Sequence, residues 1–275
     1  MKRTWRFWLS QSGIHLALAI GAVIITVPFA VMLWTAFVPQ RLLFDGGANL
    51  RDLTLANFRT ALGQASWGRY YRNSLITTAA IFLAQLATCL PAAYVLARCH
   101  FRGKRGVLWL VLACLVVPPQ AIAIPNYVLL ARGHLLDSLA ALIIPFLTSA
   151  FGIFLFRQFI LTIPQPIFDA ARLDGVGDLG MVWRIVLPNV RPAILAFGVF
   201  IVTSAWNDLF WPSVVLQRTE NATVPLGITR FAEPSAGNNY GAQMAAAVLA
   251  ILPLIVTFVV AQRQILKGIA LIIDP

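Results

Sequence analysis

The chain has 275 residues, of which 59% are hydrophobic and only 11% are charged, and its mean hydropathy is +0.80. Soluble domains carry about a quarter charged residues, so this composition excludes an ordinary soluble protein and indicates an integral membrane protein. The formal net charge of +11 could point to nucleic acid. However, the basic residues stand in short clusters between apolar runs, a pattern typical of membrane topology signals. We therefore expect no nucleic-acid partner.

Six apolar segments are long enough to cross a bilayer, whose core of about 30 Å needs roughly 20 helical residues. They are predicted at residues 14–38, 73–97, 107–131, 138–156, 193–216 and 240–261. Five of them contain no charged residue, and the segment 193–216 contains one, Asp208. We predict an all-α transmembrane domain over residues 14–266, preceded by an N-terminal segment at 1–13 and followed by a tail at 267–275.

Basic residues at the ends of these spans predict the orientation. If the N-terminus is cytoplasmic, most Lys and Arg residues fall on the cytoplasmic side, and the turn R-C-H-F-R-G-K-R at 98–105 is the strongest single signal. Both termini are therefore predicted to be cytoplasmic. The first apolar run is too long for the core of a signal peptide, so we expect it to be retained as a span.

The third predicted span contains three prolines, Pro118, Pro119 and Pro125, with Gln120 between them. Proline removes a backbone donor and bends helices, which a membrane tolerates where neighbours or a water-filled cavity satisfy the freed carbonyls. We predict a kinked span that faces a solute pathway and includes Gln120. The alternative is a kink that serves packing alone.

The fifth predicted span ends in S-A-W-N-D-L-F-W-P, which contains Asn207 and Asp208. A carboxylate at this depth is either part of a polar pathway or an interfacial anchor, and we favour the pathway. The loop at 217–239 is predicted to face an extracytoplasmic partner. A stretch around Asn57 with apolar residues at helical spacing predicts a short interfacial helix, with a plain connector as the alternative.

The stretch from Gln165 to Pro188 is charged and rich in glycine, so it cannot lie in hydrocarbon. Pro166 suits the first turn of a helix, and the pair Asp174-Gly175 suits its end. Asp178 is expected to cap a second helix that Pro188 terminates. The sequence thus predicts a helix, a turn and a second helix at the membrane surface.

The first of these helices has the features of a docking surface. Asp169 and Arg172 are three residues apart, which places both on one helical face. Ala170 and Ala171 are small, so we expect them to let another protein approach closely.

The spacing in this stretch resembles the EAA loop of bacterial ATP-binding-cassette importer permeases, which reads Glu-Ala-Ala, three residues, Gly, nine residues, Ile, any residue, Leu-Pro. This chain has Asp169-Ala170-Ala171, then Gly175, then Ile185-Val186-Leu187-Pro188 at the same spacings. It departs at Asp169, which is one methylene shorter than glutamate. With six spans and the A-W-N-D-L-F-W-P segment, the chain resembles the maltose-type, carbohydrate-uptake class of permease over nearly its whole length.

That resemblance implies the type I importer permease fold, with six transmembrane helices and a cytoplasmic coupling helix in the loop 165–188. It implies that the chain moves a sugar or sugar-like solute into the cytoplasm across a bacterial inner membrane. The implied partners are a second, similar permease, two ATPase subunits that bind ATP and Mg, and an extracytoplasmic solute-binding protein. The implied coupling residues are Asp169, Ala170, Ala171, Arg172, Asp174, Gly175, Ile185, Leu187 and Pro188.

The sequence lacks the motifs of an enzyme. No G-x-x-x-x-G-K-[ST] phosphate loop occurs, so we expect ATP to be hydrolysed by other subunits. The three histidines are isolated and form no metal-ligand spacing, so we expect no metal and no cofactor in this chain. One alternative is a self-contained secondary transporter driven by an ion gradient through Asp208. Another, within the same family, is an importer of glycerol 3-phosphate.

Overall fold

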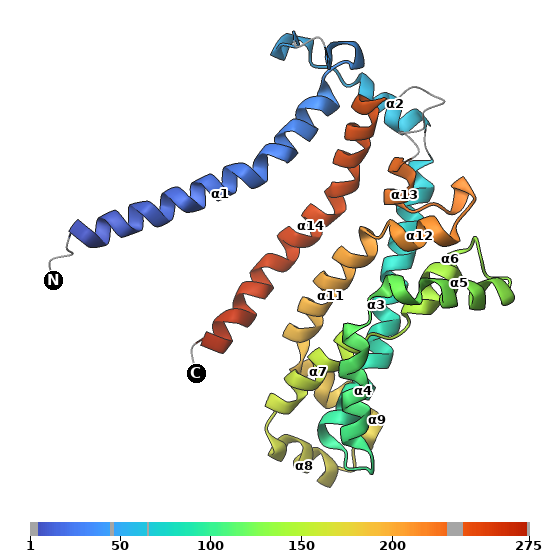
Figure 1. Ribbon diagram of the computed structural model, residues 1–275. Helices are drawn as coiled ribbons and strands as arrows, with labels where there is room; N and C mark the ends of the chain where they lie inside the picture. Colours follow the sequence, from blue (N-terminus) through green and yellow to red (C-terminus); the bar gives the residue numbers. More distant parts are fainter. Residues whose placement is uncertain (1–4, 45–46, 65, 230–238, 274–275) are drawn as a thin grey trace. The chain divides into compact units, whose positions relative to one another are not determined.

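The structure is a computed structural model that describes residues 5–44, 47–64, 66–229 and 239–273; for 5–12, Gln64 and 260–273 only the backbone is described. Over these ranges the regular secondary structure is helical (Figure 1). The chain divides into two compact units, which are described separately. The first comprises residues 1–66 and 228–251, and the second comprises 67–227 and 252–275.

The first unit contains α1 (Trp5–Phe37), two short 3-10 turns, η1 (Gln40–Leu42) and η2 (Leu50–Asp52), and α2 (Ala56–Gln64). It also contains the beginning of α14 (Tyr240–Ile273). The side-chain amide of Asn57, on α2, is buried and donates to the carbonyls of Ala36 at 3.0 Å and Val38 at 2.7 Å. These carbonyls at the end of α1 have no partner within the helix, so Asn57 satisfies them. The helix predicted around Asn57 is confirmed.

Helix α1 exposes apolar side chains over its described length. Ile24, Val27 and Val31 are each more than half exposed. A helix of a soluble protein buries one apolar stripe and turns a polar face to water. The apolar surface of α1, which is long enough to cross a bilayer, is instead what lipid solvates.

The core of the second unit lies where α3 (Trp67–Arg98) packs against α7 (Ala150–Thr162) and α11 (Arg191–Trp206). Phe156 and Phe197 are fully buried there, with ring centroids 5.0 Å apart. A Cβ at Gly152 would lie 2.8 Å from the Phe197 ring and 3.1 Å from the Cys89 sulfur. Glycine at position 152 therefore allows α7 to approach α3 and α11 closely.

Three of the six predicted spans have no single straight helix as their counterpart. Three helices are long and apolar enough to cross a membrane: Gly13–Phe37, Trp67–Arg98 and Tyr240–Val259. The others are pairs bent by 97°, 46° and 82°, so the described residues provide up to six spans if each pair counts as one.

The predicted kink in the third span is confirmed. Helix α4 (Lys104–Val116) ends before Pro118, and the chain continues through η3 (Pro119–Ile122) into α5 (Ala123–Arg132) at the 97° bend. Pro118 and Pro119 stand at the break, where their rings cannot continue the helix. Pro125 lies in the first turn of α5, where a missing backbone donor has little effect.

The fourth span is also divided. It consists of α6 (Leu139–Ile143), η4 (Ile144–Phe146) and then α7, with the 46° bend between them. The Ser138 hydroxyl accepts from the N–H of Ala141, and the Ser149 hydroxyl accepts from the N–H of Gly152. Each serine thus caps the start of a helix, which is why one helix begins after Ser138 and another after Ser149.

The continuous helix predicted over 193–216 is wrong. Helix α11 ends at Trp206, and a separate helix, α12 (Phe210–Val215), follows. The Asn207 amide donates back to the Thr203 carbonyl at 2.9 Å, and the Asp208 carboxylate accepts from the N–H of Trp211 at 3.2 Å. These side chains compete with the helical backbone pattern and separate the two helices.

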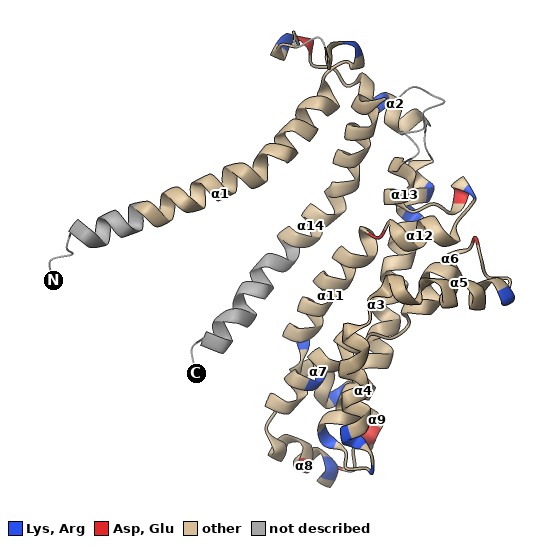
Figure 2. Cartoon of the chain, viewed as in Figure 1, with Lys and Arg blue, Asp and Glu red and all other residues tan. Residues whose placement is uncertain are grey.

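Two short elements, η6 (Thr219–Asn221) and α13 (Val224–Thr229), follow α12. Residues 230–238 of the loop predicted to face an extracytoplasmic partner lie outside the described residues. In the second unit, charged residues lie mainly at two ends, around α8 and α9 and around α13 and the turn between α5 and α6, with largely uncharged helices between them (Figure 2).

Candidate functional site

The charged stretch forms a helix, a turn and a second helix, as its sequence predicts. The N-cap residue of the second helix is Gly177 rather than Asp178, and no side chain among the described residues caps this helix. Helix α8 spans Gln165–Leu173. After the turn, one helical run consists of α9 (Asp178–Gly180), a π-helical segment η5 (Met181–Val186) and α10 (Leu187–Asn189). Pro188 does not end this run, because the helix continues to Asn189 before the 82° bend into α11. The π-helical segment has no counterpart in the prediction.

The predicted stop at Asp174-Gly175 is confirmed. The N–H groups of Asp174 and Gly175 donate to the carbonyls of Ala170 and Arg172, each at 3.0 Å. Gly175 has a φ of +77°, the left-handed region that favours glycine. No atom lies within 4 Å of a Cβ built there, so backbone conformation rather than space requires this glycine.

One face of α8 is fixed to the core of the second unit. Phe168 is 1% exposed, its ring centroid lies 6.3 Å from that of Tyr94, and the Arg98 guanidinium stands 4.5 Å from the ring centroid. This cation–π geometry fixes the helix to the end of α3. Ala171 is also buried, at 5% exposed, so of the two alanines predicted to present a low surface only Ala170 is exposed.

Arg98 joins three helices. Its Nη2 donates to the carbonyl of Ile160 at 2.8 Å and to that of Ile163, at the end of α7. Its Nη1 donates to the Gln165 side-chain oxygen at 2.9 Å, at the start of α8. The sequence prediction treated Arg98 only as a topology signal. The sequence signal for this role was the position of the arginine directly after a long apolar span, where its five N–H donors can bond to carbonyls at nearby helix ends.

The opposite face of α8 and its turn is exposed. Leu173 is 90% exposed, and Asp169 and Arg172 lie side by side with a carboxylate-to-guanidinium distance of 4.0 Å. This places Asp169 and Arg172 on one face, as predicted. Leu179, after the turn, is 71% exposed. Exposed leucines beside charged groups make a surface suited to another protein.

The last residues of the motif have a different environment. Ile185 and Leu187 are partly buried and pack against the core that contains Val186, which is fully buried. Pro188 is partly buried as well. These residues position the second helix against the core rather than forming the exposed face.

A cavity of about 600 Å³ lies within the second unit, lined by residues of α3, η3, the segment before α7, the end of α11 and α12. Gln120 and Asp208, two of the three predicted pathway residues, both line it. Asn207 is not among the lining residues, and its amide is turned back to Thr203. The structure thus brings together two segments that are 88 positions apart in the sequence.

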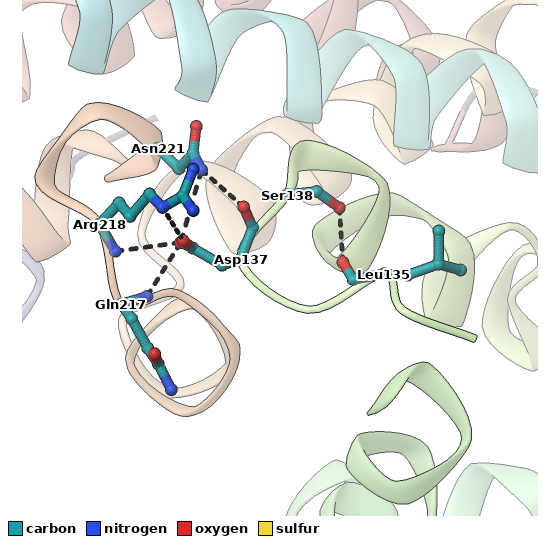
Figure 3. Close-up of polar contacts among 6 residues, drawn as sticks. All are labelled: Leu135, Asp137, Ser138, Gln217, Arg218 and Asn221. Atoms are coloured by element: carbon teal, nitrogen blue, oxygen red, sulfur yellow. Dashed lines mark hydrogen bonds and ion pairs between the residues drawn. The ribbon is translucent and has the colours of Figure 1, made fainter. Parts of the chain in front are cut away.

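One polar cluster was not predicted. Asp137, in the turn between α5 and α6, has a φ of +55° and accepts through one carboxylate oxygen from the N–H groups of Gln217 and Arg218, each at 3.0 Å (Figure 3). Its other oxygen lies 3.1 Å from Nε of Arg218. The Asn221 amide donates to the Asp137 carbonyl at 2.6 Å. We call these four residues the Asp137 cluster.

The Asp137 cluster stabilises the ionised carboxylate. Burial raises the pKa of Asp137, but the backbone N–H groups of Arg218 and Gln217, the Asn221 amide and the Arg218 charge together hold that pKa below its ordinary value. The cluster joins the turn at 133–138 to the turn after α12. Helices α5, α6 and α12, which flank these turns, each contribute residues to the cavity lining. A lone acidic residue between two apolar segments was the available sequence signal.

Bent apolar helices around a cavity, and an exposed loop fixed to the core, are the arrangement expected of the membrane subunit of a transporter. Residues 89–270, more than half of the chain, match the family described as binding-protein-dependent transport system inner membrane component. The chain belongs to this family, whose members are the non-catalytic permease subunits of ATP-binding-cassette importers.

Curated relatives agree with this assignment. The chain is 30% identical to the arabinooligosaccharides transport system permease protein AraQ of Halalkalibacterium halodurans, over 95% of this chain and 94% of that protein. It is 28% identical to the sn-glycerol-3-phosphate transport system permease protein UgpE of Yersinia pestis, over 93% and 94%.

A solved structure has the same fold. It is a chain of a bacterial ABC transporter involved in the import of the acidic polysaccharide alginate, with a TM-score of 0.82, 22% sequence identity and coverage of 96% of this chain and 98% of that chain. The predicted all-α fold of the type I importer permeases is confirmed.

Proposed function

We propose that this chain moves a sugar or sugar-like solute across the bacterial inner membrane into the cytoplasm, driven by ATP hydrolysis in separate subunits. Two relatives with nearly full coverage are permeases for arabinooligosaccharides and for glycerol 3-phosphate, which supports this solute class. The implied partners are a second permease, two ATPase subunits that bind ATP and Mg, and an extracytoplasmic solute-binding protein. A related transporter was solved in complex with an alginate-bound periplasmic protein, which supports the last of these.

The observation that carries the proposal is the construction of α8. Its inner face is fixed to the core through Phe168, while Leu173 and the pair Asp169 and Arg172 stand exposed. A partner that binds this exposed face can therefore move α8 only together with the core. In this proposal the ATPase subunit binds here, with Asp169, Ala170, Arg172, Asp174 and Gly175 at the contact and Ala171, Ile185, Leu187 and Pro188 supporting it from behind.

The proposed topology and transport cycle are built on this arrangement of α8. In this proposal both termini and α8 are cytoplasmic, and the loop at 217–239 faces the solute-binding protein. Closure of the ATPase subunits on ATP moves α8 and the helices fixed to it, which opens the cavity containing Gln120 and Asp208 first to one side and then to the other. Asn207 acts by separating α11 from α12 rather than by contacting solute, since its amide is held by Thr203.

The test compares two glycines of the same turn. Gly175 has a φ of +77°, whereas Gly177 has a φ of −72° and a ψ of 169°, which any residue adopts. Neither has an atom within 4 Å of an added Cβ. Because a β-branched residue is strained at positive φ, Gly175→Val should distort the turn while Gly177→Val should not.

The measurements are ATP-dependent uptake and co-purification of the ATPase subunits. We expect Gly175→Val to lose most of its uptake and part of its ATPase association, and Gly177→Val to keep both. Full uptake and normal association in Gly175→Val would refute the coupling assignment. Uptake by the purified chain alone, in vesicles with an ion gradient and no ATP, would instead support a secondary transporter.

A further inference from the structure

Three residues that line the cavity in the second unit carry buried polar atoms without a hydrogen-bond partner in the described structure. These atoms are the Thr77 and Thr223 hydroxyls and the Gln85 side-chain oxygen. All three residues are more than nine-tenths buried. Buried polar groups are almost always satisfied, so three unpartnered groups on residues around one cavity favour a site that a solute or water completes.

The Gln85 amide is held in one orientation. Its Nε2 donates to the Phe146 carbonyl at 2.8 Å, so its oxygen is left as a fixed acceptor. The threonine hydroxyls can each donate and accept. A sugar hydroxyl also donates and accepts, and this lining complements it.

Aromatic side chains provide the rest of the wall. Phe146 and Trp211 both line the cavity and meet edge to face, with ring centroids 6.3 Å apart. The Trp211 indole is held by donation to the Ala141 carbonyl at 2.9 Å. Apolar and aromatic walls with a few fixed polar groups are the ordinary composition of a small-molecule site, and aromatic faces suit the C–H face of a sugar ring.

The cavity lining that the structure describes carries negative charge and no positive charge. Among the lining residues, Asp208 is the only Asp, Glu, Lys, Arg or His. One of its oxygens accepts from the N–H of Trp211, which is a backbone contact and brings no positive charge. A carboxylate in a partly enclosed site repels an anion more strongly than it would in water.

We propose that this cavity binds an uncharged, polyhydroxylated solute and that Asp208 acts as a specificity residue against anionic solutes. This inference rests on the proposed function and narrows its substrate class. Similarity to known proteins does not decide between an uncharged and an anionic solute. The relatives include permeases named for arabinooligosaccharides and for glycerol 3-phosphate, and the solved neighbour is involved in the import of an acidic polysaccharide.

The first test uses Asp208→Asn, which keeps a side-chain oxygen as acceptor for the Trp211 N–H and removes only the charge. The complete transporter in membrane vesicles is given arabinotriose or the anionic trisaccharide trigalacturonate, and equilibrium binding and uptake are measured. We expect wild type to prefer arabinotriose, and the variant to bind trigalacturonate about tenfold better relative to arabinotriose, the effect of one partly screened like-charge contact. An unchanged ratio overturns the role of Asp208.

The second test uses two adjacent threonines as a matched pair. Thr77 and Thr78 are 6% and 4% exposed, and both hydroxyls lack a partner, but only Thr77 lines the cavity. Thr77→Val should weaken arabinotriose binding severalfold, and Thr78→Val should leave it unchanged. Equal effects of the two substitutions would overturn the cavity as the binding site.

The outcomes of these tests distinguish failure of the inferred binding site from failure of the proposed function. If ATP-dependent uptake persists while the two threonine variants behave alike, the transporter assignment stands and the inferred site fails. If wild type shows no ATP-dependent uptake of any solute, while Thr77→Val still selectively weakens arabinotriose binding, the site stands and the coupling proposal fails.

Discussion

Gly152 and Gly175 are both required to be glycine, for different physical reasons. Gly175 has a positive φ and open space around it, so its requirement comes from the backbone. The sequence motif predicted this position because a helix end needs such a residue. Gly152 has an ordinary helical backbone, but its neighbours Phe197 and Cys89 leave no room for a Cβ. Only tertiary packing defines this second requirement, so the sequence alone could not predict it.

The packing at Gly152 gives a stability prediction. In Gly152→Ala the added methyl meets the Phe197 ring, so we expect a loss of about 1–3 kcal/mol, typical of an overpacked core. Gly106→Ala is the control, because Gly106 is also helical and has no atom within 4 Å of its Cβ position. Alanine in an open helical site is expected to stabilise slightly. Thermal unfolding of the purified complex measures both variants, and equal midpoints for the two would contradict the prediction.

At the scale of elements, hydrophobicity predicted apolar segments of membrane-spanning length but not the breaks within them. Six apolar segments could be counted from the sequence because bilayer thickness sets their length. The prolines predicted the bend between α4 and α5 for the same local reason. The break after Trp206 depends on how the Asn207 and Asp208 side chains bond to nearby backbone. The helical propensity of this apolar run does not reveal that these two side chains compete with the hydrogen bonds of the helical backbone.

The Asp137 cluster shows the same limit over a longer distance. Asp137 is bonded to Gln217 and Arg218, which lie 80 and 81 residues later in the chain. No local pattern indicates a pairing of this kind. The cluster holds the turn between α5 and α6 against the turn after α12, two elements whose neighbours contribute to the cavity wall.

Stability of this cluster should depend on pH. Because the pKa of Asp137 is lowered by folding, the carboxylate contributes stability that is fully present above about pH 4, the ordinary value, and is lost as the pH falls through the lowered pKa. Hydrogen exchange at the Gln217 and Arg218 amides, corrected for the intrinsic pH dependence of exchange, measures this. In wild type we expect protection to be constant at neutral pH and to fall in acid.

Two variants control this pH experiment. Asp137→Asn should show weaker protection of both amides at neutral pH and no loss in acid, because the side chain has no proton to gain. Glu220→Gln should behave as wild type, since its ion pair with Arg69 is exposed on both sides and contributes little. Protection that falls in acid equally in wild type and Asp137→Asn would show that another group is responsible.

At the scale of the whole second unit, α3 connects the two candidate sites. Thr77 and Gln85 on this helix line the cavity, and Arg98 at its end holds α7 and α8. The exposed face of α8 could be predicted from its motif. Its connection to the cavity could not, because it depends on one guanidinium that reaches carbonyls more than 60 positions away. We propose that α3, which runs between the two sites, carries movement of α8 to the cavity.

This route predicts a defect in coupling rather than in assembly. In Arg98→Lys a single ammonium replaces the fork whose two nitrogens bond separately to Gln165 and to the end of α7, and it does not stack on Phe168 as a planar guanidinium does. The exposed face of α8 is untouched, so the ATPase subunits should still co-purify. We expect uptake per ATP hydrolysed to fall severalfold in reconstituted vesicles. Arg102→Lys, at an exposed position in the following turn, should keep the wild-type ratio. If Arg98→Lys also keeps that ratio, movement of α8 does not reach the cavity through Arg98.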